Sequence, residues 1–158
     1  MRIDSATGTL YFERTATRIA PTLTRAAFLT SPLGTQSLVW VQHEPHCAYR
    51  VAVQLGSEPF AVVVQFHGEH LQSVSLSMLR RRWGTTLAEG SEEAERERQA
   101  AHDAWLEEQF GPPPYTYPWG AIESSHDPRS GSSAIVIQYA APPRRWVFWH
   151  GLRRHFGR

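Results

Sequence analysis

Two short segments rich in histidine carry the side chains best suited to metal chemistry. One is His43-Glu44-Pro45-His46-Cys47 and the other is His67-Gly68-Glu69-His70. Imidazole nitrogens and cysteine thiolates are ligands that zinc prefers, and two histidines that flank a two-residue turn share one face of a hairpin. The pattern therefore admits a small metal-dependent hydrolase that uses these four histidines. Nothing in the spacing brings the two segments together, so ordinary turn residues are the competing interpretation. We assign no metal ligand and no cofactor.

Nucleophilic and acid–base chemistry has less support. Cys47 and His46 are neighbours beside a predicted strand, where adjacent side chains point to opposite faces. His102 and Asp103 are neighbours in a predicted helix, where they do not face each other. The chain has no Walker-type phosphate loop and no Gly-x-Gly-x-x-Gly segment. The sequence leaves an enzyme open, assigns no catalytic residue, and favours a protein without catalytic activity.

Charged and aromatic side chains offer a different chemistry, the binding of another protein. Two glutamates end the predicted long helix, an aromatic loop follows it, and the C-terminal segment combines arginines with aromatic residues. Tryptophan, tyrosine and arginine are enriched in the residues that dominate protein interfaces. Each group also has a structural interpretation: a solvated, salt-bridged helix face that also includes Glu95 and Arg98, a loop that closes the core, and a last strand packed on the sheet. The candidate partner-binding residues are Glu107, Glu108, Tyr115, Tyr117, Trp119, Arg144, Arg145, Trp149, Arg153 and Arg154.

Charge is segregated along the chain, although the net charge is only +1. Residues 1–90 carry eight arginines against six acids, residues 91–110 carry two against seven, and residues 111–158 carry six against two. All 16 strong cations are arginine, whose planar guanidinium binds carboxylates in a bidentate way. Because a dedicated nucleic-acid-binding protein is usually more basic, we expect a protein partner and no nucleic acid.

The length of 158 residues predicts one domain covering residues 1–158, with 144–158 as a basic aromatic C-terminal arm or last strand. The single cysteine, Cys47, excludes an intramolecular disulfide and fits a reducing compartment. No apolar stretch approaches the roughly 18 residues of a membrane span, and the first residues lack the apolar run of a signal peptide. We therefore expect a cytoplasmic protein.

Hydrophobic periodicity, caps and turn residues predict mostly strands with two helices. A threonine cap precedes the short helix, while Ser91 and Gly111 bound the long one. Runs of strands with separate helices predict an α+β fold: an antiparallel sheet of about five to six strands with one long and one short helix packed on one face. The predicted strands cover 9–13, 37–41, 49–55, 59–66, 71–76, 121–125 and 134–139, and the predicted helices cover 25–29 and 92–110.

Two resemblances to known bacterial proteins rest on particular stretches. Residues 19–28 followed by residues 66–74 resemble the helix-then-meander pattern of outer-membrane assembly lipoproteins of the SmpA/OmlA type and of β-lactamase-inhibitor-like domains. The stretch from Tyr117-Pro118-Trp119-Gly120 through residues 127–133 resembles uncharacterised small bacterial α+β proteins found in toxin-immunity contexts. The second resemblance implies a toxin as partner and carries no catalytic residue.

These observations favour a non-enzymatic protein-binding domain, most concretely an immunity protein that binds and neutralises a cognate bacterial toxin or effector. The metal-dependent hydrolase is one alternative. A self-associating adaptor domain, homodimeric through residues 144–158, is another.

Overall fold

The computed structural model describes residues 1–55, 58–79, 91–127 and 131–140, and within them the chain forms two antiparallel sheets. Residues 144–158, with the predicted binding residues Arg144, Arg145, Trp149, Arg153 and Arg154, lie outside the described residues. The large sheet has the strand order β4 (Leu38–His43), β5 (His46–Leu55), β6 (Glu58–His67), β7 (His70–Met78), β10 (Ser132–Tyr139), β9 (Gly120–Asp127) and β8 (Tyr115–Tyr117). The small sheet consists of β1 (Arg2–Asp4), β2 (Thr9–Phe12) and β3 (Thr17–Ile19).

The α+β class and the antiparallel pairing are confirmed, but the predicted number of strands is wrong. The described residues form a seven-stranded sheet and a three-stranded sheet instead of one sheet with five to six strands. Three strands that the sequence did not indicate, β1, β3 and β8, have three residues each. A strand of three residues is too short to show an alternation of apolar and polar side chains, so it can be recognised only from its hydrogen bonds to a partner strand.

Two helices, α1 (Arg25–Leu29) and α2 (Glu92–Phe110), begin and end at the predicted residues. A 3-10 turn, η1 (Glu13–Thr15), links β2 to β3, and a second, η2 (Gly34–Gln36), links α1 to β4. The side chain of Ser91 accepts a hydrogen bond from Ala94 N at 3.1 Å, which caps the first turn of α2. Gly111 ends α2 with a φ of 78°, a conformation that glycine adopts without strain. No helix in the described ranges is long and apolar enough to cross a membrane.

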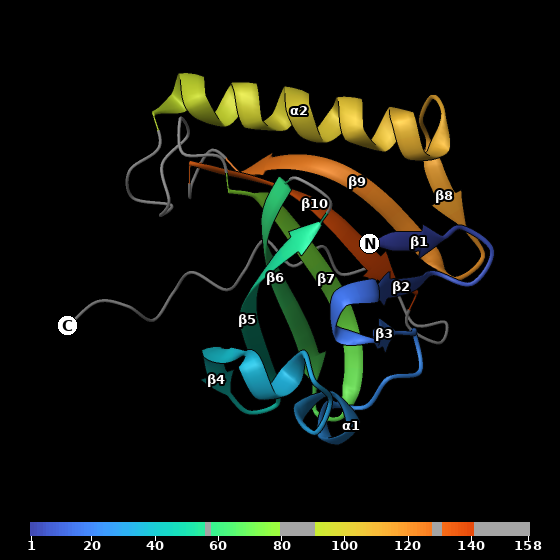
Figure 1. The fold of residues 1–158 in the computed structure, drawn as a ribbon, viewed down its shortest axis with the longest axis vertical. Helices are drawn as coiled ribbons and strands as arrows, with labels where there is room; N and C mark the ends of the chain where they lie inside the picture. Colours follow the sequence, from blue (N-terminus) through green and yellow to red (C-terminus); the bar gives the residue numbers. More distant parts are fainter. Residues whose placement is uncertain (56–57, 80–90, 128–130, 141–158) are drawn as a thin grey trace.

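Both helices contact the same face of the large sheet, at opposite ends of it (Figure 1). The ring of Phe28 on α1 lies 5.6 Å from the ring of Phe66, and Trp105 on α2 lies 6.2 Å from Phe60. Phe60 and Phe66 are six residues apart on β6, so their side chains point to one face. Buried residues of both sheets and both helices join in a single hydrophobic core on that face.

The buried face of α2 is more polar than the sequence suggested. Glu95, Arg98 and His102 are buried together with Leu106, whereas we expected Glu95 and Arg98 on a solvated helix face. The four residues recur at helical spacing, so they share one side of α2. Burial of the charged pair is tolerated because Glu95 forms an ion pair with Arg98 and also accepts a hydrogen bond from Ser133.

Candidate functional site

The four histidines singled out in the sequence form one continuous row across the large sheet. His43 pairs with His46 across β4 and β5, His46 with His67 across β5 and β6, and His67 with His70 across β6 and β7. Directly paired residues share a face of a sheet, and the rings of His46 and His67 lie 4.8 Å apart. We call these four residues the histidine row. The two segments therefore do meet, at the end of the sheet where two hairpins turn.

The histidine row does not converge on a point. Neighbouring strands lie about 4.8 Å apart, so the row extends over about 14 Å from β4 to β7. Accordingly, no group of three or more histidine, cysteine, aspartate or glutamate side chains in the described part of the chain could hold a metal ion. The geometry thus gives the metal-dependent hydrolase no support. Burial, and then the neighbouring His67 and His43, lower the pKa of His46, which favours its neutral form.

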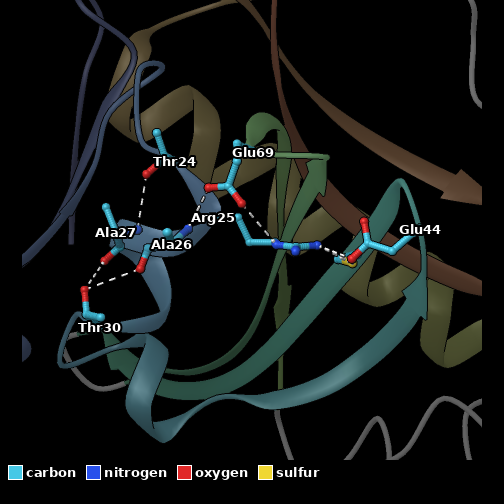
Figure 2. Close-up of polar contacts among 8 residues, drawn as sticks. Thr24, Arg25, Ala26, Ala27, Thr30, Glu44 and Glu69 are labelled. Carbon is cyan, nitrogen blue, oxygen red and sulfur yellow. Dashed lines mark hydrogen bonds and ion pairs between the residues drawn. The ribbon is translucent and has the colours of Figure 1, made fainter.

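Arg25 at the start of α1 connects both hairpin turns, as Figure 2 shows. Its Nη1 donates to Glu44 Oε1 at 2.7 Å, and its Nε lies 3.5 Å from Glu69 Oε1. The other oxygen of Glu69 accepts a hydrogen bond from Ala26 N at 3.0 Å. The hydrogen bond from Arg25 lowers the pKa of Glu44, and the bond to Glu44 raises the pKa of Arg25. This Arg25 network fixes α1 against the ends of β5 and β6.

Cys47 belongs to the Arg25 network and not to a catalytic pair. Its sulfur accepts a hydrogen bond from Arg25 Nη1 at 2.9 Å, and the side chain is 3% exposed. Cys47 pairs with the buried Phe66, whereas His46 pairs with His67, so the two neighbours point to opposite faces as predicted. The arrangement supplies no imidazole to activate the thiol.

The exposed edge of the large sheet carries an apolar surface that sequence reasoning missed. Leu38 is 74% exposed, Val39 59% and Trp40 50%, and these three consecutive residues of β4 form what we call the apolar edge. Leu29, at the end of α1, is the other exposed large hydrophobic residue of the described chain. Leu38 pairs with Arg50 and Val39 with the buried Tyr49, so these two side chains are exposed on opposite faces of the edge strand. Exposed apolar surface on a soluble protein can mark an interaction site. The sequence carried no signal for this exposure, because it depends on whether another strand pairs with the free side of β4.

Trp40 is held in place by Arg50 of the neighbouring strand. The guanidinium carbon of Arg50 lies 4.9 Å from the centroid of the Trp40 ring, a cation–π contact. Register shifts between Val39 and Val41, so Trp40 is an extra residue in β4. Such a bulge bends an edge strand and re-aims its side chains.

The predicted binding residues on α2 and β8 lie in different environments. Glu107 and Glu108 are exposed near the end of α2, whereas Tyr115 is buried and donates its hydroxyl to Gly111 O at 2.9 Å. Trp119 donates Nε1–H to Ser5 O at 2.8 Å, and its ring is stacked on Tyr117 with centroids 5.0 Å apart. Trp119 therefore connects the two sheets. In the described part of the chain, β8 lies at the opposite edge of the large sheet from β4, so Tyr115 and Tyr117 do not lie beside the apolar edge.

Comparison with known proteins adds a likeness of fold. No family model matches the sequence, and no curated protein matches it. A chain of the solved structure "Rhs1-CT in complex with cognate immunity protein RhsI1" superposes with a TM-score of 0.57 at 18% identity, over 88% of this chain and 86% of that chain. At 18% identity this likeness shows a shared fold. The resemblance of the first half to outer-membrane assembly lipoproteins finds no support from family matches.

Proposed function

We propose that this chain is an immunity protein that binds and neutralises a cognate bacterial toxin in the cytoplasm of the cell that produces it. The observation that carries the proposal is the fold shared, over 88% of the chain, with a chain of the Rhs1-CT complex with its immunity protein. Neutralisation by binding requires a surface complementary to the toxin and no catalytic residue of its own. The exposed apolar edge beside Arg50 supports the proposal, because tryptophan and arginine are enriched among the residues that dominate protein interfaces.

The test is protection of growing cells. The chain is expressed together with a candidate toxin domain, and colony counts are compared with cells that express either protein alone. We expect the toxin alone to stop growth, the chain alone to be harmless, and the pair to grow. The purified pair should elute as one complex with a 1:1 mass ratio.

Two results would contradict the proposal. Toxicity of the chain when expressed alone would make it a toxin domain of the same fold. Failure to protect against the toxin, with both proteins present and folded, would remove the immunity role. Rhs1-CT serves as the specificity control, because at 18% identity the binding surface is not expected to be shared.

A further inference from the structure

We propose that Trp40, Arg50 and Leu38 form the surface that binds the toxin, and that the toxin presents an apolar pocket with a carboxylate at its rim. The inference rests on the proposed function and names the part of the chain that performs it. Trp40 would enter the pocket, and the guanidinium of Arg50 would pair with the carboxylate. None of these three residues was among the candidates that the sequence suggested.

Exposure is the first observation that points to this surface. The apolar edge holds three of the four exposed large hydrophobic side chains in the described part of the chain. Leu38 lies directly opposite Arg50, and Arg50 lies directly opposite the half-buried Val63, so all three share one face. Trp40 reaches the same face through its contact with Arg50. An aromatic anchor with an arginine over its ring is the composition of an interface hot spot.

The bulge at Trp40 indicates how the partner docks. A partner strand that paired with β4 would need an unbroken ladder of backbone groups along the edge. The extra residue at Trp40 interrupts that ladder between Val39 and Val41. Side-chain docking therefore fits this edge better than the addition of a strand.

Charge indicates the chemistry of the partner. Glu44 and Glu69, the acids of the neighbouring hairpin turns, are both bound to Arg25. Arg50 forms no ion pair with any carboxylate in the described ranges, where its side-chain contact is the Trp40 ring. A guanidinium that stacks on an aromatic ring still presents its N–H groups at the edge for a bidentate carboxylate. An acidic rim around an apolar pocket complements this surface.

The experiment measures, by titration calorimetry, the affinity for the toxin domain that the chain neutralises in the growth test. We expect Trp40→Ala to weaken binding about 30-fold or more, the loss typical of a hot-spot residue. Arg50→Glu should weaken binding more than Arg50→Ala, because the reversed charge would face the carboxylate. Arg14→Glu, a reversal at an exposed arginine of η1, is the matched control and should change affinity less than about threefold. Melting temperatures check that each variant folds.

Each outcome has one meaning. Wild-type affinity in folded Trp40→Ala and Arg50→Glu variants overturns the surface assignment and leaves the immunity function standing. A wild-type chain that neither binds nor neutralises the toxin overturns the function, and this inference with it. A wild-type dimer in light scattering that Trp40→Ala converts to a monomer would show that a second copy occupies the apolar edge, which also overturns the inference.

Discussion

The carboxylate of Glu95 on α2 accepts two hydrogen bonds from Ser133 on β10, one from its backbone N–H and one from its hydroxyl, each 2.8 Å long. Glu95 and Ser133 are both buried, and Arg98 forms an ion pair with the same carboxylate. A buried charge is tolerated when it is paired and hydrogen-bonded. Because these bonds join a helix to a strand, they fix the position of α2 on the sheet.

Glu95→Ala should destabilise the fold strongly. The substitution leaves the Arg98 guanidinium buried without its carboxylate and removes both bonds from Ser133. We expect a loss of about 3 kcal/mol in the free energy of unfolding, measured by urea denaturation at pH 7.5. Glu93→Ala, at an exposed position in the same turn, should cost about 0.5 kcal/mol or less. Equal losses in the two variants would mean that the buried bonds contribute nothing specific.

His102 should make the stability depend on pH. Its Nε2 accepts a hydrogen bond from Met78 N at 3.2 Å, so the neutral ring is the bonded form. Burial, and then the charge of Arg98, lower the pKa of His102 from 6.5 to about 4. A group whose pKa is lower in the folded state than in the unfolded state contributes fully to the stability of the fold at pH values above its unfolded pKa. This contribution is lost as the pH falls toward its folded pKa. Between pH 7.5 and pH 5 the contribution of His102 should fall by about 2 kcal/mol.

His102→Gln isolates this effect, because the glutamine oxygen can accept the bond from Met78 N but does not titrate. Urea denaturation of both proteins at a series of pH values gives the two dependences. The variant should be less sensitive to acid between pH 6.5 and pH 5 than the wild type. Parallel curves would show that His102 titrates normally in the folded protein.

Trp119→Ala should act on stability before it acts on binding. The indole donates to Ser5 O, and its ring packs near Gly8 and Tyr139, so the side chain joins the small sheet to the large one. We expect a loss of about 2 kcal/mol in the free energy of unfolding, and Thr116→Ala, exposed on β8, should cost about 0.5 kcal/mol or less. If Trp119→Ala instead leaves the melting temperature unchanged and weakens toxin binding, the indole is a contact residue.

Charge reversal on α2 distinguishes between two candidate surfaces for toxin binding. Glu107 and Glu108 are exposed there, and as partner-binding residues they require a basic patch on the toxin, whereas Arg50 requires an acidic one. The double variant Glu107→Arg, Glu108→Arg should bind within about threefold of wild type if the apolar edge is the main interface. A loss of about 30-fold, with the melting temperature retained, would move the interface to the end of α2.

Local patterns were sufficient for most of the secondary structure. The ends of α1 and α2 follow from Thr24, Ser91 and Gly111, because capping depends on residues within one turn of the helix. The long strands β5, β6 and β7 follow from apolar alternation. The strands β1, β3 and β8 did not follow, since three residues carry no period and each strand forms only against the adjacent strand across a turn.

Less of the candidate site than of the secondary structure could be predicted from the sequence. The composition of the two histidine segments was visible, but their alignment depends on the register of three strand pairs. That same register spreads the imidazoles over several strands instead of gathering them. The apolar edge was interpreted only as another strand, because exposure depends on whether a second strand lies alongside β4.

The sequence by itself therefore determined the kinds of element, their caps and the turns between them, because these depend on side chains a few residues apart. Only the tertiary structure decided which residues share an environment. It buried Glu95 beside Ser133, left Trp40 exposed beneath Arg50 and set four histidines in a row. The physical reason is that burial and pairing depend on what packs across from a residue, as Ser133 does for Glu95 from 38 residues away, and the residues beside it in the chain do not specify that neighbour.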